Sequence, residues 1–156
     1  MSIPGFDPET AGNHEEIEMQ FAVKTVEHLE AYQKLLYALP PSKLKLTKVD
    51  DELFEDFKKT FPELATPEAL SHLSEAEMKT AAGKEKWRNF IMKYEKIIPD
   101  YNFGTMLRPD AKRDYDQDNS MFVTRTQFYA IEVARNKLGV NDDRTHDATF
   151  NPFAIR

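Results

Sequence analysis

The stretch FVTRTQFYAIEVARNKLG, residues 122–139, carries the clearest local signals in the chain and predicts a helix with marked ends. Thr124 and Gln127 have the T-x-x-Q spacing of a capping box, in which each side chain satisfies a backbone N–H group at the helix start. Gly139 follows the helical pattern, and glycine readily takes the left-handed conformation that ends a helix. Apolar residues recur at helical spacing between these signals and predict a buried stripe of Phe128, Ile131, Ala134 and Leu138.

A long amphipathic helix is predicted over residues 15–39, where apolar side chains recur every three or four positions. Pro40 and Pro41 end it, because proline lacks the backbone N–H group and restricts the residue before it. We expect this helix to bury a stripe formed by Met19, Ala22, Val23, Val26, Leu29, Tyr32 and Leu36.

Shorter helices are predicted downstream from capping residues and apolar spacing. Prolines at positions 62 and 99 lie just past two of them, where a helix cannot continue. The predicted ranges are residues 50–61, a short helix that begins at residues 66–67, a turn or two at residues 74–77, and residues 84–98.

Two short apolar runs, FGTML at residues 103–107 and SMFV at residues 120–123, are able to pair as a β-hairpin. Two short strands are only marginally stable alone, so the hairpin would have to pack on the helices. The expected fold is therefore all-α or mainly α, a small orthogonal bundle of about five helices with one short hairpin near residues 103–123.

One domain is expected, because 156 residues suit a single hydrophobic core. We assign it to residues 14–139. Residues 1–13 contain prolines and glycines without helical periodicity, and residues 140–156 lose the periodicity again. We expect both to be mobile segments.

The composition excludes several classes of function. The net charge of -6 argues against nucleic-acid binding, which depends on clustered Lys and Arg. The chain has no cysteine, and its four histidines lie far apart, so we expect no metal site and no cofactor. No apolar run is long enough to span a bilayer and the N-terminus has no targeting pattern, so we expect a cytoplasmic protein that does not bind membranes.

Catalytic motifs are missing from the sequence. The five glycines are isolated, so no glycine-rich nucleotide loop is present, and no G-x-S-x-G nucleophile motif occurs. The abundant carboxylates are typical of helix N-termini and solvated surface. We therefore expect no catalytic residues and a protein that is not an enzyme.

Three motifs in series resemble the family called polysaccharide biosynthesis domain-containing protein: KWRNF at residues 86–90, DYNFGTMLR at residues 100–108 and FVTRTQFYAIEVARN at residues 122–136. The stretches at residues 18–36 and 42–63 are similar to the N-terminal half of that family. The resemblance implies a small, mainly helical fold without catalytic residues. It also implies that eukaryotic members are dedicated chaperones of translation elongation factor 1A, which meet the new chain near the ribosome and shield its GTP-binding domain.

Two interpretations of the central motif remain open. In one, its aromatic residues lie in the core, Gly104 permits a tight turn and Arg108 pairs with an acidic neighbour. In the other, aromatic and arginine side chains form a protein-recognition patch, because they combine apolar area with directional donors. The predicted partner-binding residues are Trp87, Arg88, Tyr101, Asn102, Phe103, Gly104, Arg108, Arg125, Arg135, Asn136, Phe150 and Phe153.

The leading hypothesis is an ATP-independent chaperone or assembly factor that binds newly made elongation factor 1A and protects it from misfolding and aggregation. The alternatives are a small enzyme or accessory protein of glycan biosynthesis, and a general adaptor between proteins. Phe150 and Phe153 lie in the C-terminal stretch ATFNPFAIR. This stretch is expected either to fold back on the domain or to dock on the client or a ribosome-associated factor.

Overall fold

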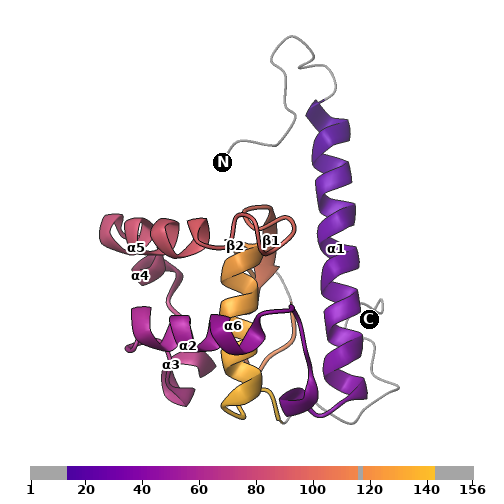
Figure 1. Cartoon of the computed structure of the whole chain (residues 1–156). Helices are drawn as coiled ribbons and strands as arrows, with labels where there is room; N and C mark the ends of the chain where they lie inside the picture. Colours follow the sequence, from indigo (N-terminus) through magenta and orange to yellow (C-terminus); the bar gives the residue numbers. More distant parts are fainter. Residues whose placement is uncertain (1–13, 116–117, 143–156) are drawn as a thin grey trace.

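The computed structural model describes residues 14–115 and 118–142, and only the backbone of residues 14–18 (Figure 1). The predicted mainly helical fold with one hairpin is confirmed. In chain order the elements are α1 (His14–Ala38), the 3-10 helix η2 (Pro41–Lys43), α2 (Asp50–Thr60), α3 (Pro67–Ser71), α4 (Glu75–Met78), α5 (Ala81–Met92), β1 (Gly104–Leu107), β2 (Met121–Thr124) and α6 (Arg125–Lys137).

Helix α6 is the centre of the fold and lies between α1 and the layer of shorter helices α2 to α5 (Figure 1). Its predicted capping box is present: Gln127 N–H donates to Thr124 Oγ1 at 3.2 Å, and Thr124 N–H donates to Gln127 Oε1 at 2.9 Å. Phe128, Ile131 and Ala134 are fully buried as predicted, and Gly139 has the expected positive φ of 80°.

Helix α1 has the predicted length, but the predicted stripe is wrong in its N-terminal half. Met19 is 67% exposed, Val23 52% and Val26 44%, whereas Leu29 and Leu36 are buried as predicted. The N-terminal end of α1 extends past the hairpin (Figure 1), but residues further along contact it through another face: Phe21 packs on Phe103 and Phe122, and His28 bonds to Thr105. Periodicity identified the helix but not which of its faces meets the neighbouring elements.

Aromatic rings join α2 to α5. Phe61 and Trp87 stack with ring centroids 4.0 Å apart, and Phe57 and Phe90 pack around them. Helix α5 starts earlier than predicted, because Thr80 caps it by accepting a hydrogen bond from Gly83 N–H. It also ends earlier, at Met92, and residues 93–98 form turns held by three- and four-residue hydrogen bonds.

The hairpin pairs β1 with β2 in antiparallel register, with Gly104 opposite Thr124 and Leu107 opposite Met121. Its open end is tied to α6: the Arg125 N–H group donates to the Phe103 carbonyl at 2.8 Å, so β2 continues directly into α6. The hairpin is thereby held at the N-terminal end of the central helix.

The packed domain continues past its predicted end at Gly139, because Val140 and Asn141 are buried. The predictions for residues 1–13 and for residues 143–156, which include Phe150 and Phe153, lie outside the described residues. In the described part of the chain, no helix combines the length and the apolar character needed to cross a bilayer.

Candidate functional site

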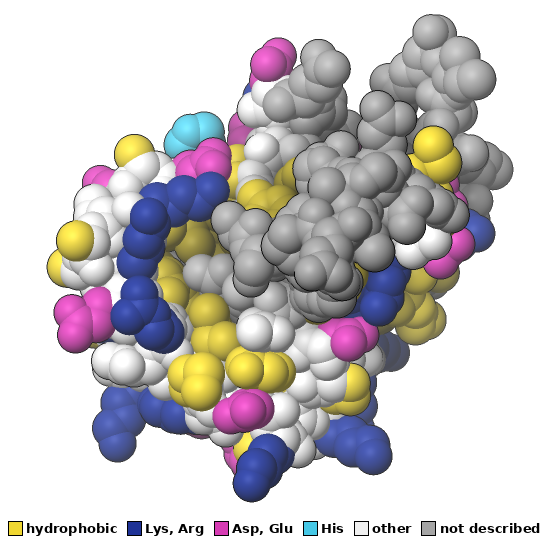
Figure 2. All heavy atoms as spheres, turned by 90° about the horizontal axis from the view of Figure 1, so that it is seen from above, with side chains coloured by type: hydrophobic (Ala, Val, Ile, Leu, Met, Phe, Trp, Pro, Cys, Tyr) yellow, Lys and Arg dark blue, Asp and Glu magenta, His cyan; other side chains and the backbone are white. Residues whose placement is uncertain are grey.

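An open groove of about 920 Å³ separates α5 from β2. Its residues come from the end of α4, from α5, from Tyr101 and Asn102, from all four residues of β2 and from Gln127 of α6. Figure 2 looks onto this end of the molecule and shows hydrophobic side chains in a hollow beside a row of Lys and Arg side chains. The groove therefore combines an apolar floor with a cationic edge.

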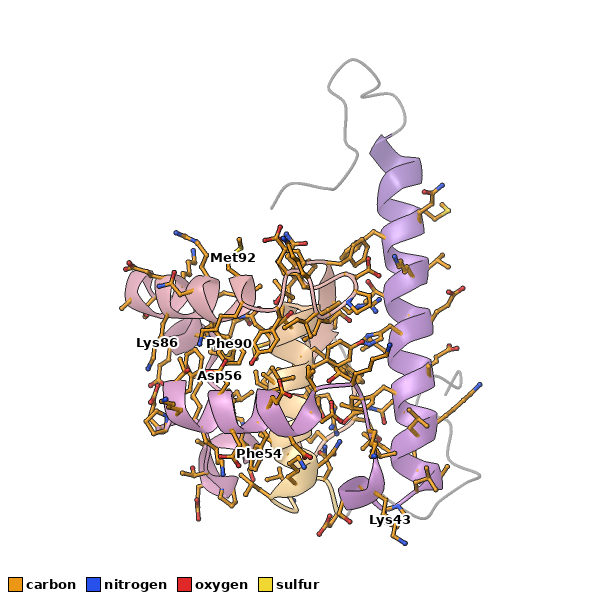
Figure 3. The ribbon with its side chains drawn as sticks, viewed as in Figure 1. Lys43, Phe54, Asp56, Lys86, Phe90 and Met92 are labelled. Atoms are coloured by element: carbon orange, nitrogen blue, oxygen red, sulfur yellow. The ribbon has the colours of Figure 1, made fainter. Side chains whose placement is uncertain are left out.

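Helix α5 forms one wall of the groove and has two different faces, one buried in the core and one exposed. Trp87 and Phe90 point into the core, while Lys84, Arg88 and Met92 recur four residues apart on the outer face. Figure 3 shows this division: Phe90 lies on the side of α5 towards α2, and Met92 lies on the opposite side. Met92 is 51% exposed and, with Ile91 beside it, adds apolar surface to this wall of the groove.

The opposite wall is β2 and the start of α6. Met121 and Val123 of β2 are buried, whereas the Phe122 ring packs beside Phe21 of α1 with centroids 5.7 Å apart. Gln127 is held in the capping box, so this wall is positioned by a hydrogen-bonded helix start. The wall is thus positioned by the capping box at its α6 end and by the contact of Phe122 with α1.

The charges that border the groove are positive. Lys79 forms an ion pair with Glu75 at 2.6 Å, but Lys84 and Arg88 are exposed and have no carboxylate partner among the described residues. No Asp or Glu lines the groove in the described part of the chain. In a chain with a net charge of -6, this groove is thus a local cationic region able to attract an acidic group.

Four of the predicted partner-binding residues come together here: Trp87, Arg88, Tyr101 and Asn102 all line the groove. Arg88 and Asn102 are exposed and Tyr101 is half-buried. Trp87 is only 2% exposed, so its main role is to support the floor from the core rather than to contact a partner.

Phe103 and Arg125 lie beside the groove rather than in it. The Phe103 ring packs against Phe21 of α1 with centroids 5.5 Å apart. Lys24 Nζ lies 4.4 Å from its centroid and the Arg125 guanidinium lies 5.8 Å away. These residues join α1 to the hairpin, and cation–π contacts reinforce the joint.

Gly104 was predicted to bind a partner, and the structure corrects this. Gly104 is buried, and a Cβ atom at this position would come within 2.1 Å of the Phe122 ring. Glycine is needed here so that the ring can lie against the β1 backbone. Its role is packing.

Arg108, Arg135 and Asn136 are also corrected, because all three are buried in the core. Both arginines are 0% exposed and face Glu132, which is equally buried. Arg135 donates to Glu132 Oε1 at 2.8 Å, and the Arg108 guanidinium lies 3.6 Å from the same oxygen. Arg135 is inside because α6 is surrounded by other elements, so even polar residues of this helix lie in the core. Arg108, which directly follows β1, reaches the same carboxylate from the hairpin side.

A group of buried polar residues surrounds this carboxylate. We call it the Glu132 cluster; it consists of Glu132, Arg108, Arg135, Tyr32, Asn136 and Asn141. Burial alone would raise the pKa of Glu132, but the charges of Arg108 and Arg135 outweigh it and hold the pKa below its ordinary value. Tyr32 and Asn141 donate to the other carboxylate oxygen. Arg108 Nε has no hydrogen-bond partner among the described residues, but both carboxylate oxygens of Glu132 are bonded and every member is buried. The cluster is therefore a structural network and not a surface for a partner.

Sequence reasoning missed Lys84, Ile91, Met92 and the residues of β2 as parts of a site. A usable signal was present for α5, because Lys84, Arg88 and Met92 share the helix face opposite Trp87. No comparable signal existed for β2, since a run of apolar residues does not reveal which edge of the strand is left open.

Known proteins share the sequence motifs and the fold described above. A family model described as PBDC1 protein matches residues 17–146. The PBDC1 homolog of Saccharomyces cerevisiae is 54% identical over 137 residues, which cover 88% of this chain and 94% of that protein. Protein PBDC1 of Homo sapiens is 42% identical over 141 residues, which cover 90% of this chain and 58% of that protein.

A solved structure shows the same fold. The solution NMR structure of a Saccharomyces cerevisiae protein aligns with a TM-score of 0.77 at 53% sequence identity, covering 89% of this chain and 95% of that one. The resemblance inferred from the three sequence motifs is therefore confirmed, and the chain belongs to the PBDC1 protein family.

Proposed function

We propose that this protein is an ATP-independent chaperone that binds newly made translation elongation factor 1A through the groove between α5 and β2. The observation that carries the proposal is the groove itself: an open, apolar surface with Met92 exposed on one wall and cations along its edge. A surface of this kind suits protein recognition, since apolar area supplies affinity and charged donors supply orientation. The choice of client rests on the family resemblance.

The mechanism we propose is stoichiometric. The groove covers apolar surface of the GTP-binding domain while that domain is incompletely folded, when such surface promotes aggregation. Folding or nucleotide binding then buries this surface in the client, which removes the chaperone's site and releases it. No ATP is needed, because the folding of the client itself provides the driving force.

The charge distribution supports selective encounter. The chain is acidic overall. At the groove, however, Lys84 and Arg88 have no carboxylate partner among the described residues. Complementary charge raises association rates and orients the approaching partner. A client segment with an acidic group beside apolar side chains would match this groove.

The test is a refolding assay with purified, denatured GTP-binding domain of elongation factor 1A, diluted into buffer without ATP. Equimolar wild-type protein is expected to lower light scattering, and the Arg88→Glu and Met92→Glu variants are expected to lose this effect. Matched controls are Lys43→Glu, which makes the same change of cation to anion at the opposite end of the molecule (Figure 3), and Met19→Glu, at an exposed methionine of α1. Equal protection by all four variants would rule out the groove as the client site.

A further inference from the structure

We infer that the groove binds its client segment as an added β-strand: an extended, apolar and acidic stretch pairs with the open edge of β2 and places its acidic side chains against Lys84 and Arg88. This inference rests on the proposed function, because it names the chemistry of the segment that occupies the same groove. Strand addition is an established way for an exposed sheet edge to bind an extended peptide.

The direction of the backbone groups of β2 follows from the register. Arg125 N–H donates to the Phe103 carbonyl, which makes the Phe103–Arg125 pair a hydrogen-bonded one. Hydrogen-bonded and non-hydrogen-bonded pairs alternate along an antiparallel ladder. The pair of Met106 with Phe122, three residues along each strand, is therefore non-hydrogen-bonded, and the N–H and C=O groups of both residues point away from the partner strand.

Two hydrogen bonds agree with these outward directions of the backbone groups. The outward Met106 carbonyl on β1 accepts a hydrogen bond from the Tyr115 hydroxyl at 3.2 Å. On β2 the N–H group of Thr124, which points the same way as that of Phe122, donates to Gln127 Oε1. One edge of the hairpin is thus covered by Tyr115, and the other is turned towards the groove.

Because the Thr124 N–H group is already bonded to Gln127, Phe122 is the residue of β2 whose N–H and C=O groups both point into the groove. Neither group has a hydrogen-bond partner among the described residues. An unpaired strand edge is a template for another strand. A helix in the groove would satisfy its own backbone and leave these groups unpaired, so an extended segment is the occupant that completes the site.

The opposite wall selects the side chains of that segment. Lys84 and Arg88 lie one helical turn apart on α5 and are exposed, while Ile91 and Met92 add apolar surface on the same helix. An extended segment directs alternate side chains to opposite sides. A segment that alternates apolar and acidic residues therefore places its apolar side chains on the floor and its carboxylates within reach of the two cations.

The experiment uses the full chain and a short synthetic peptide in which valine alternates with glutamate. Two further versions carry backbone N-methyl groups, one on every valine and the other on every glutamate. The alternation fixes which face of the peptide meets the floor, because a slip by one residue would exchange the two kinds of side chain. Only one methylated version removes the N–H groups that face β2, so that version is expected to bind about tenfold more weakly, and the other like the parent.

Amide hydrogen exchange followed by NMR locates the bound peptide. The Phe122 amide is expected to exchange more slowly when the peptide is bound. Combining Lys84→Glu with Arg88→Glu is expected to weaken binding about tenfold or more, whereas Lys43→Glu leaves it unchanged. Equal binding of both methylated peptides overturns strand addition, and so does a Phe122 amide that is already protected in the free chain, because another part of the chain would then occupy the edge.

The two proposals fail separately. Binding of elongation factor 1A that depends on Arg88 but slows exchange at no amide of β2 would retain the proposed function and overturn strand addition. Peptide binding at the β2 edge without binding of elongation factor 1A would retain strand addition and overturn the choice of client.

Discussion

The groove and the Glu132 cluster hold the same kinds of residue in opposite environments. Arg88 at the groove is exposed and has no carboxylate partner in the described structure, whereas Arg108 and Arg135 are fully buried and share one carboxylate. All three come from the motifs that predicted a single arginine patch. The difference shows that arginine and aromatic residues in a sequence motif do not by themselves reveal whether the arginine lies in solvent or in the core.

The position of each helix accounts for the difference. Helix α5 lies at the edge of the fold, so its outer face keeps its charges in solvent. Helix α6 lies between other elements, and its charged residues Glu132 and Arg135 are enclosed with Arg108. Two buried guanidinium groups share one buried carboxylate here. The stability of the fold should therefore depend on each of these charged groups, since a buried charge without its partner is costly.

The largest expected effect is the loss of the central carboxylate. Glu132→Gln keeps the size of the side chain but leaves Arg108 and Arg135 without an anion, which is expected to lower the free energy of unfolding by about 3 to 5 kcal/mol. Urea denaturation measures this loss. The exposed Glu95 gives the control, because Glu95→Gln is expected to leave stability unchanged.

A second substitution sharpens this prediction. Adding Arg108→Met to Glu132→Gln removes one of the two unneutralised cations and is expected to recover part of the lost stability. A loss for Glu132→Gln no larger than that of the Glu95 control would show that the cluster does not depend on its charge.

An intermediate effect is expected at His28, which joins α1 to the hairpin through a 3.0 Å hydrogen bond between its Nδ1 and Thr105 Oγ1. Burial, followed by the positive charge of Arg125, lowers the pKa of His28 to about 4. The native state therefore favours the neutral ring, whereas the unfolded chain takes up a proton near pH 6.5. Stability is expected to fall as the pH drops from about 6.5 to about 4, and to be unaffected by this group above that range.

The size of this pH effect is expected to be about 1 kcal/mol, below what the full shift implies because the ring is partly exposed. Melting temperatures recorded across this pH range measure it. His28→Gln cannot titrate and is expected to flatten the slope, while an unchanged slope would assign the pH dependence to other groups.

The smallest effect on stability is expected at the groove. Arg88→Ala should change the free energy of unfolding by no more than about 0.5 kcal/mol, since the side chain is exposed and unpaired within the described structure. The same change is expected to weaken binding of elongation factor 1A about fivefold or more. Calorimetric unfolding and a binding titration on the same sample separate the two quantities, and a large loss of stability would place Arg88 with the structural arginines.

Local signals in the sequence predicted much of the fold. The capping box at Thr124 and Gln127, the stop at Gly139 and the prolines after α1 and α2 identified helix ends, because these features act within a few residues. The site was predicted only in part: Arg88, Tyr101 and Asn102 line the groove, but Arg108, Arg135 and Gly104 belong to the core.

The helices, the hairpin and the family could be predicted from the sequence, since periodicity, capping residues and motifs are properties of neighbouring positions. Which face of each element meets water depends instead on how the elements pack together. Met19 and Val26 fit an apolar stripe yet are exposed, and Arg135 fits a polar surface yet is fully buried. Burial depends on elements distant in the chain, such as β1 and α2 around α6, and their arrangement is set by packing of the whole core rather than by any local pattern.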